Sequence, residues 1–131
     1  MNRAQLIRES DRLWHLLVAH GFQHRCILCG LSATDPHHWK YIRSVHQYRW
    51  VLENGVYTCR TCHNAIEQDP ETRARLYAVI ADDYPHLWAW AESQPPLGSR
   101  PISNWQIKTI LAGLQRTADT LGVSYATQKA T

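Results

Sequence analysis

The stretch that decides the fold lies between residues 26 and 70 and reads CILCG at 26–30, DPHHWKYIRS at 35–44 and YRWVLENGVYTCRTCHNAIEQDP at 48–70. It holds all four cysteines of the chain as two pairs, Cys26 with Cys29 and Cys59 with Cys62, each separated by two residues. Each pair places two thiolates on one tight turn, and two pairs supply the tetrahedral sulfur set that structural zinc prefers. We therefore predict one structural Zn²⁺ site.

Two other readings of the cysteines are weaker. A redox pair with this spacing needs a βαβ context, which the sequence does not show. Disulfides are disfavoured in the reducing compartment that we expect for this chain. Because four thiolates leave zinc no open position, catalytic chemistry has to lie elsewhere.

Three histidines and one asparagine are the candidate catalytic and metal-binding residues. His37 and His38 are adjacent, Asn54 follows His38 after sixteen residues, and His63 comes directly after Cys62. Phosphodiester hydrolysis needs a base that activates water and a cation that holds the charge on the leaving oxygen. A neutral imidazole and one divalent metal ion together provide both.

In this order of residues, the stretch 26–70 resembles the HNH endonucleases, in which paired histidines end the first strand, an asparagine fixes the following loop and a histidine opens the next helix. The resemblance implies a ββα-metal (His-Me finger) core that hydrolyses DNA to a 5′-phosphate and a 3′-hydroxyl. It implies that His38 is the general base and that Asn54 holds the loop that aims it. It also implies that His37 and His63 bind the catalytic cation.

Glu67 lies one helical turn after His63, on the same helix face, where it can complete the metal ligands. Members of the family often carry another histidine near this position. A carboxylate there shifts the expected metal toward harder ions such as Mg²⁺ or Mn²⁺.

The charge distribution favours a nucleic-acid partner. The formal net charge is +3, and arginine, whose planar fork suits phosphate oxygens, far outnumbers lysine. Solvated surface charge would give the same total, but between residues 25 and 60 five cations face two acids. We predict contacts to the DNA backbone from Lys40, Arg43, Arg49 and Arg60. Trp39 and Trp50 are assigned to packing rather than to base stacking.

The rest of the chain is predicted to be mainly helical. A first helix over about 3–19, with Asn2 and Gln5 spaced as a capping box, carries an apolar face that includes Trp14 and is expected to serve packing. Residues 48–52 and 55–59 are predicted as strands around the turn signal of Asn54 and Gly55. Further helices are expected from near Cys62, from Asp69, in 86–93 and from Ser103 to Gly122, with a linker at 93–101 and a frayed end at 124–131. The histidines expected to have ordinary roles are His15, His20, His24, His46 and His86.

Together these features predict one α+β domain over 1–131, with an N-terminal helix (1–21), a zinc knuckle and ββα-metal core (22–70) and a helical extension (71–131). The layout after the knuckle resembles small phage HNH proteins, including recombination nucleases of the NinG and Rap kind, which implies branched or phage-replication DNA as substrate. No apolar run approaches the roughly 20 residues that cross a bilayer, and the start lacks a secretory signal, so we expect a cytoplasmic protein without a membrane or small-molecule partner.

Two other functions remain open at this point. The chain fits a non-catalytic, zinc-bearing accessory protein that binds DNA during packaging or recombination, and it also fits a ribonuclease. Nothing in the residues separates them from a DNA endonuclease, whereas a nicking assay on DNA and RNA does.

Overall fold

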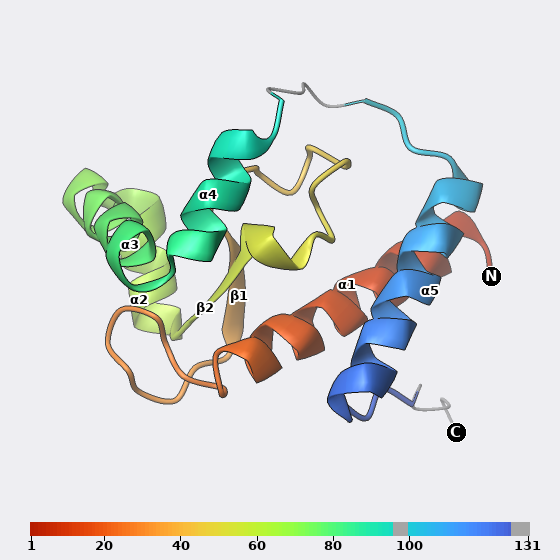
Figure 1. The fold of residues 1–131 in the computed structure, drawn as a ribbon, viewed down its shortest axis with the longest axis horizontal. Coiled ribbons are helices and arrows are strands. Elements are labelled where there is room, and N and C mark those ends of the chain that lie inside the picture. Colours follow the sequence, from red (N-terminus) through yellow and green to blue (C-terminus); the bar gives the residue numbers. More distant parts are fainter. Residues whose placement is uncertain (96–99, 127–131) are drawn as a thin grey trace.

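A two-stranded antiparallel sheet lies in the middle of the computed structural model, which describes residues 1–95 and 100–126 (Figure 1). Strand β1 (Asp35–His38) pairs with β2 (Gly55–Thr58), so that Asp35 faces Thr58 and His38 faces Gly55. Helix α2 (Arg60–Gln68) begins directly after the N-cap Cys59. The predicted α+β class is confirmed, with five α-helices in these described ranges.

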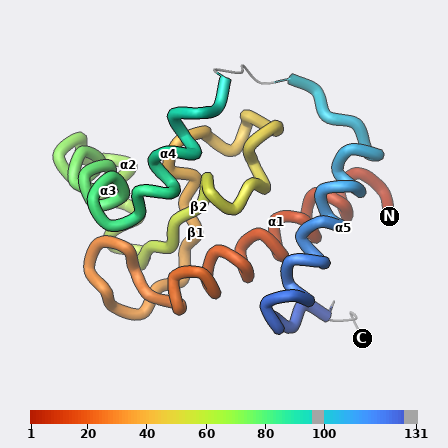
Figure 2. The backbone as a smooth tube through the Cα atoms, viewed as in Figure 1, coloured from red at the N-terminus to blue at the C-terminus, as the bar shows by residue number. Residues whose placement is uncertain are grey.

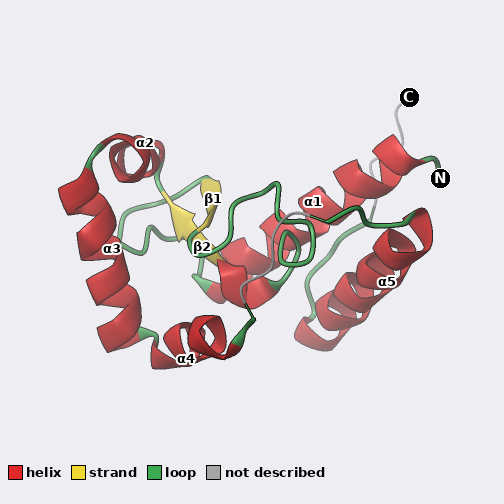
Figure 3. Cartoon of the chain, turned by 90° about the horizontal axis from the view of Figure 1, so that it is seen from above, coloured by secondary structure: helices red, strands yellow, loops and turns green. Residues whose placement is uncertain are grey.

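Helices cover the sheet from two sides (Figures 1 and 3). On one side α2 is followed by α3 (Pro70–Asp83) and α4 (Pro85–Ser93). On the other side α1 (Arg3–Gly21) lies against α5 (Asn104–Leu121). Each side buries its own apolar cluster, and β2 contributes to both through Tyr57 and Val56.

The predicted helix ends are mostly confirmed because they depend on local chemistry. Asn2 with Gln5 and Ser103 with Gln106 form capping boxes at the starts of α1 and α5. Asp69 caps α3. Gly122 ends α5 in the left-handed region, at φ 71°. The predicted linker 93–101 and frayed end 124–131 fall partly on 96–99 and 127–131, which lie outside the described residues.

The strand prediction for residues 48–52 was wrong. The backbone trace in Figure 2 follows a long loop from β1 to β2, which ends in a 3₁₀ turn, η1 (Leu52–Asn54). Here the amide of Val51 donates to the carbonyl of Tyr48 at 3.2 Å, and that of Asn54 donates to Val51 at 3.2 Å. Because successive turns satisfy these backbone groups locally, the segment does not need a strand partner, and β2 pairs with 35–38 instead.

Trp39 and Trp50 are each 4% exposed and belong to the two apolar clusters, as their assignment to packing predicted. None of the helices in the described part of the chain combines the length and the apolar character needed to cross a bilayer.

Candidate active site and cysteine cluster

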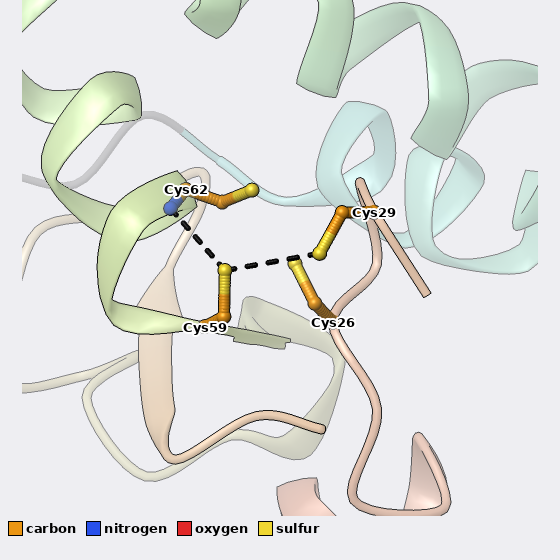
Figure 4. Close-up of side chains that lie close together, drawn as sticks. All are labelled: Cys26, Cys29, Cys59 and Cys62. Atoms are coloured by element: carbon orange, nitrogen blue, oxygen red, sulfur yellow. Dashed lines mark hydrogen bonds between the residues drawn. The ribbon is translucent and has the colours of Figure 1, made fainter. Parts of the chain in front are cut away.

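The four cysteines converge from two separate segments (Figure 4). Cys26 and Cys29 lie in the loop after α1, whereas Cys59 caps α2 and Cys62 lies in its first turn. All four sulfur atoms lie within 4.8 Å of one another, and Sγ of Cys29 is 3.8 Å from Sγ of Cys59. A tetrahedron with zinc–sulfur bonds of about 2.3 Å has edges of about 3.8 Å. The cluster therefore fits a structural zinc site.

The close approach of the sulfur atoms changes the pKa values of the thiols. Burial raises the pKa of Cys62, and the adjoining sulfurs of Cys59 and Cys26 raise it further. Burial also opposes ionisation of Cys26, but the backbone amides of Cys29, Cys59 and Leu28 bring its pKa down to about 7. Four thiolates this close repel one another unless a positive charge lies between them, so the donor set is suited to a metal ion.

A second group of side chains that could hold a metal ion lies across the junction of β1 and α2. Nitrogens of His37 and His63 and a carboxylate oxygen of Glu67 all lie within 4.8 Å of one another. The rings of His37 and His63 meet edge to face, with centroids 5.3 Å apart. Nε2 of His63 is 3.4 Å from Oε1 of Glu67, one turn later on α2. Two imidazoles and one carboxylate fit a divalent cation.

His37 is suited to metal binding by its protonation state. Burial, followed by the proximity of His63 and His38, lowers the pKa of His37 to about 4. The ring is therefore neutral at physiological pH and keeps a lone pair for a metal ion.

Asp35 is a site residue that sequence reasoning missed. Its Oδ2 atom lies 3.6 Å from Nδ1 of His63, on the ring edge opposite Glu67. A carboxylate behind a ligating histidine fixes the ring orientation and strengthens the ligand. Asp35 is held in turn by Nε of Arg60 at 2.7 Å and by the hydroxyl of Thr34 at 2.8 Å. Its position directly before Pro36 and the paired histidines was the only signal in the sequence.

His38, the expected general base, has a defined hydrogen-bond state. Its Nε2 atom lies 2.8 Å from the carbonyl oxygen of Arg49. Because a carbonyl only accepts, Nε2 must carry the proton, which leaves the lone pair on Nδ1. Burial lowers the pKa of His38, so the neutral form predominates at pH 7. The indole of Trp14 is stacked on one face of this ring, with centroids 4.2 Å apart.

Asn54 is fully buried and ties the loop 39–51 to the start of β2. Its Oδ1 accepts from the backbone amides of Lys40 and Tyr41, at 3.2 and 2.9 Å. Its Nδ2 donates to the carbonyls of Tyr41 and Tyr48, at 2.8 and 3.2 Å. The amide thus uses both ends to hold the loop that also supplies the carbonyl partner of His38.

The four cations expected at DNA differ in position. Lys40 is exposed, and the side chains of Arg43 and Arg60 are 68% and 74% exposed. Arg49 is only 8% exposed, and its Nε and terminal nitrogen donate to the two oxygens of Asp11 at 3.0 and 2.7 Å. The guanidinium fork of Arg49 is thus occupied inside the protein, unlike the exposed side chains of the other three cations.

The candidate base His38 and the candidate metal ligands His37, His63 and Glu67 line one cleft of about 520 Å³. Helix α1 was predicted only to pack, yet it forms one wall through Asp11, Trp14 and His15. His15, predicted to be ordinary, bonds the hydroxyl of Tyr57 through Nε2 at 3.0 Å. The i, i+3, i+4 spacing of the wall residues was visible in the sequence, but the cleft itself depends on tertiary packing. It is lined by Asp11, Trp14, His15, Pro36, His37, His38, Ile42, Arg43, His63 and Glu67.

The geometry has to be interpreted without a relative of known function. No family model, no curated protein and no solved structure matches the chain, so the likeness to HNH endonucleases rests on the motif residues and on their arrangement.

Proposed function

We propose that the protein is a metal-dependent endonuclease of the HNH type that hydrolyses phosphodiester bonds in DNA. One observation carries the proposal: the donor atoms of His37, His63 and Glu67 converge at the same cleft that His38 lines. A base and a metal-binding set on one cleft are the two parts that phosphodiester hydrolysis needs.

In this reaction His38 takes a proton from the attacking water. Its Nε2 proton is committed to the carbonyl of Arg49, so Nδ1 is the accepting atom. The ring has a lowered pKa and is ready to accept this proton at neutral pH.

His37, His63 and Glu67 hold the divalent cation, and Asp35 orients His63 from behind. When bound, the cation stabilises the negative charge that develops on the leaving oxygen. Compared with a third histidine at this position, the carboxylate of Glu67 shifts the preference toward harder ions such as Mg²⁺ or Mn²⁺.

The order of elements supports the finer assignment of a ββα-metal core. The first strand ends at His38, the second follows a long loop, and the helix that carries His63 comes directly after it. In the proposed protein the cysteine cluster is the zinc knuckle that fixes the loop at 26–29 to the junction of β2 and α2.

A nicking assay tests the function. Purified protein is incubated with supercoiled plasmid and with linear, nicked, forked and four-way DNA, in Mg²⁺, Mn²⁺ or EDTA. Cutting that requires the added metal is expected on at least one form. If no form is cut in either metal while the protein still binds DNA, the chain is a zinc-bearing accessory protein. Metal-dependent cutting of RNA but not DNA would identify a ribonuclease.

Glu67→Gln is expected to weaken the affinity of the protein for the catalytic metal ion by about tenfold or more, because a charged ligand becomes a neutral amide. The measurement is the Mn²⁺ concentration that gives half-maximal nicking, alongside calorimetric titration with Mn²⁺. Glu92→Gln is the matched control, since Glu92 is exposed on α4 and lies outside the cluster. An unchanged Mn²⁺ requirement in Glu67→Gln would remove Glu67 from the ligand set.

Arg43→Ala and Arg49→Ala are expected to act differently. Arg43→Ala should remove one proposed contact to a DNA phosphate. The plot of log DNA affinity against log salt concentration should therefore become less steep by about one. Arg49→Ala should leave this slope unchanged and lower the melting temperature, because the carboxylate of Asp11 loses the two hydrogen bonds that it accepts from the buried guanidinium group of Arg49. Fluorescence anisotropy with labelled duplex in EDTA measures binding without cutting. A reduced slope in Arg49→Ala alone would reverse the assignment of the two arginines.

A further inference from the structure

Helix α1 contacts the ring of His38 directly. The indole of Trp14 and the imidazole of His38 are stacked with centroids 4.2 Å apart and an interplanar angle of 7°. Parallel rings this close prevent the imidazole from turning about its χ2 bond without displacing the indole. The N-terminal helix therefore sets the plane of the ring.

Trp14 is itself fixed on its other sides. Its Nε1 donates to the carbonyl of Val51 at 3.0 Å, and the side chain is 3% exposed. Gly55 lies against it so closely that a Cβ atom there would come within 2.7 Å of Cζ2 of Trp14 and 2.6 Å of Val18. Only glycine leaves the indole in this place.

Asp11, one turn earlier on α1, is linked to the same ring indirectly, through Arg49. Its carboxylate accepts two hydrogen bonds from Arg49, one from Nε1 of Trp50 at 2.8 Å and one from the exposed Arg43 at 3.3 Å. The backbone carbonyl of Arg49 is the group that accepts from Nε2 of His38. Asp11 thus fixes the segment that determines which ring nitrogen carries the proton.

We propose that α1 is a positioning element for His38, with Trp14 holding the plane of the ring and Asp11 holding its hydrogen-bond partner through Arg49. One face of one helix then fixes both the orientation and the tautomer of the base. The catalytic meaning of this arrangement rests on the proposed function, but the fixed ring is a property that can be measured without any cutting.

The test uses NMR of the full-length, zinc-loaded protein labelled with ¹⁵N-histidine, with His38 assigned from His38→Ala. In the wild type, His38 should show one tautomer, protonated at Nε2, and ring protons shifted upfield by the indole. Trp14→Leu and Asp11→Asn should each give mixed tautomers at His38. Trp105→Leu is the matched control, because Trp105 is 73% exposed on α5 and lines no part of this cleft.

Kinetics supplies the second readout. In Trp14→Leu and Asp11→Asn, kcat should fall by about tenfold or more while KM for DNA changes less than about twofold, as expected for misplacement of a reacting group. Trp14→Phe keeps a flat ring without the indole N–H and should fall between wild type and Trp14→Leu. It replaces Trp14→Leu if that variant does not fold.

Two results would overturn the positioning role: a wild-type His38 with two tautomers and no upfield shift, or wild-type kcat in both Asp11→Asn and a folded Trp14 variant. The nuclease proposal fails separately. If the wild type cuts neither DNA nor RNA but its His38 is a single, upfield-shifted tautomer, the positioning stands and the proposed reaction does not.

Discussion

Cys59→Ser is expected to unfold the protein or to leave it without a cooperative melting transition. Cys59 belongs to the sulfur cluster and also caps α2, where its Sγ accepts from the amide of Cys62 at 3.4 Å. Structural zinc sites of this kind contribute apparent binding energies of about 10–16 kcal/mol in zinc-finger peptides. Small domains have net stabilities of about 5–15 kcal/mol, so losing the metal removes an amount comparable to the whole.

Circular dichroism melting and zinc content measure this effect together. Removing zinc from the wild-type protein with a chelator should reproduce the loss of structure, because it breaks the same zinc–sulfur bonds without a mutation. Thr61→Ser is the matched control, since Thr61 lies exposed between Cys59 and Cys62. A Cys59→Ser protein that lacks zinc and yet melts like the wild type would show that the cluster does not stabilise the fold.

The features that could be predicted from the sequence are those that depend on short separations along the chain. Two cysteines with two residues between them, a capping box, or glycine after an apolar helix each determine a local geometry almost wherever they occur. The convergence of the two cysteine turns could be predicted because a structural zinc ion needs four ligands and each turn supplies two. For the same reason Glu67 could be placed beside His63, because both lie on one helix face.

What could not be predicted depends on contacts between distant segments. Asp11 and Arg49 are 38 residues apart, and nothing in the sequence around either residue indicates that the arginine is buried against that carboxylate. The charge pattern counted Arg49 with the exposed cations because it records sign and not burial. The role of α1 was missed for the same reason: an amphipathic pattern predicts that a helix packs, but not against which side chain.

The structure of the loop 39–51 depends both on local sequence and on contacts between distant segments. Its apolar and aromatic residues at 48–52 indicated a strand, and the local turns overrode that propensity. Asn54 precedes Gly55 at the predicted turn and also holds this loop through four hydrogen bonds, so it is a buried tether as well as a turn residue. The tether, the carbonyl of Arg49 and the stack on Trp14 all act on one short region around His38, which explains why a small sheet suffices to support it.

His38→Ala is expected to reduce kcat for DNA cutting by about 10²–10⁴ while leaving the melting temperature close to that of the wild type. The rate falls because no other group takes the proton from water. Stability changes little because the losses are one hydrogen bond, worth about 1 kcal/mol, and the stack of a partly exposed ring on Trp14, worth about 0.5–1.5 kcal/mol. Single-turnover cleavage and thermal melting measure the two effects.

His15→Ala is the control that makes this prediction specific to His38. His15 lines the same cleft from α1, but it belongs to neither group of candidate metal ligands in the described chain. Its loss should lower the rate far less than the loss of His38. If His15→Ala instead abolished cutting and His38→Ala did not, the base would be on α1 and not at the end of β1. If His38→Ala melted as poorly as Cys59→Ser, the ring would be structural, because a group that only exchanges protons can be removed without unfolding the chain around it.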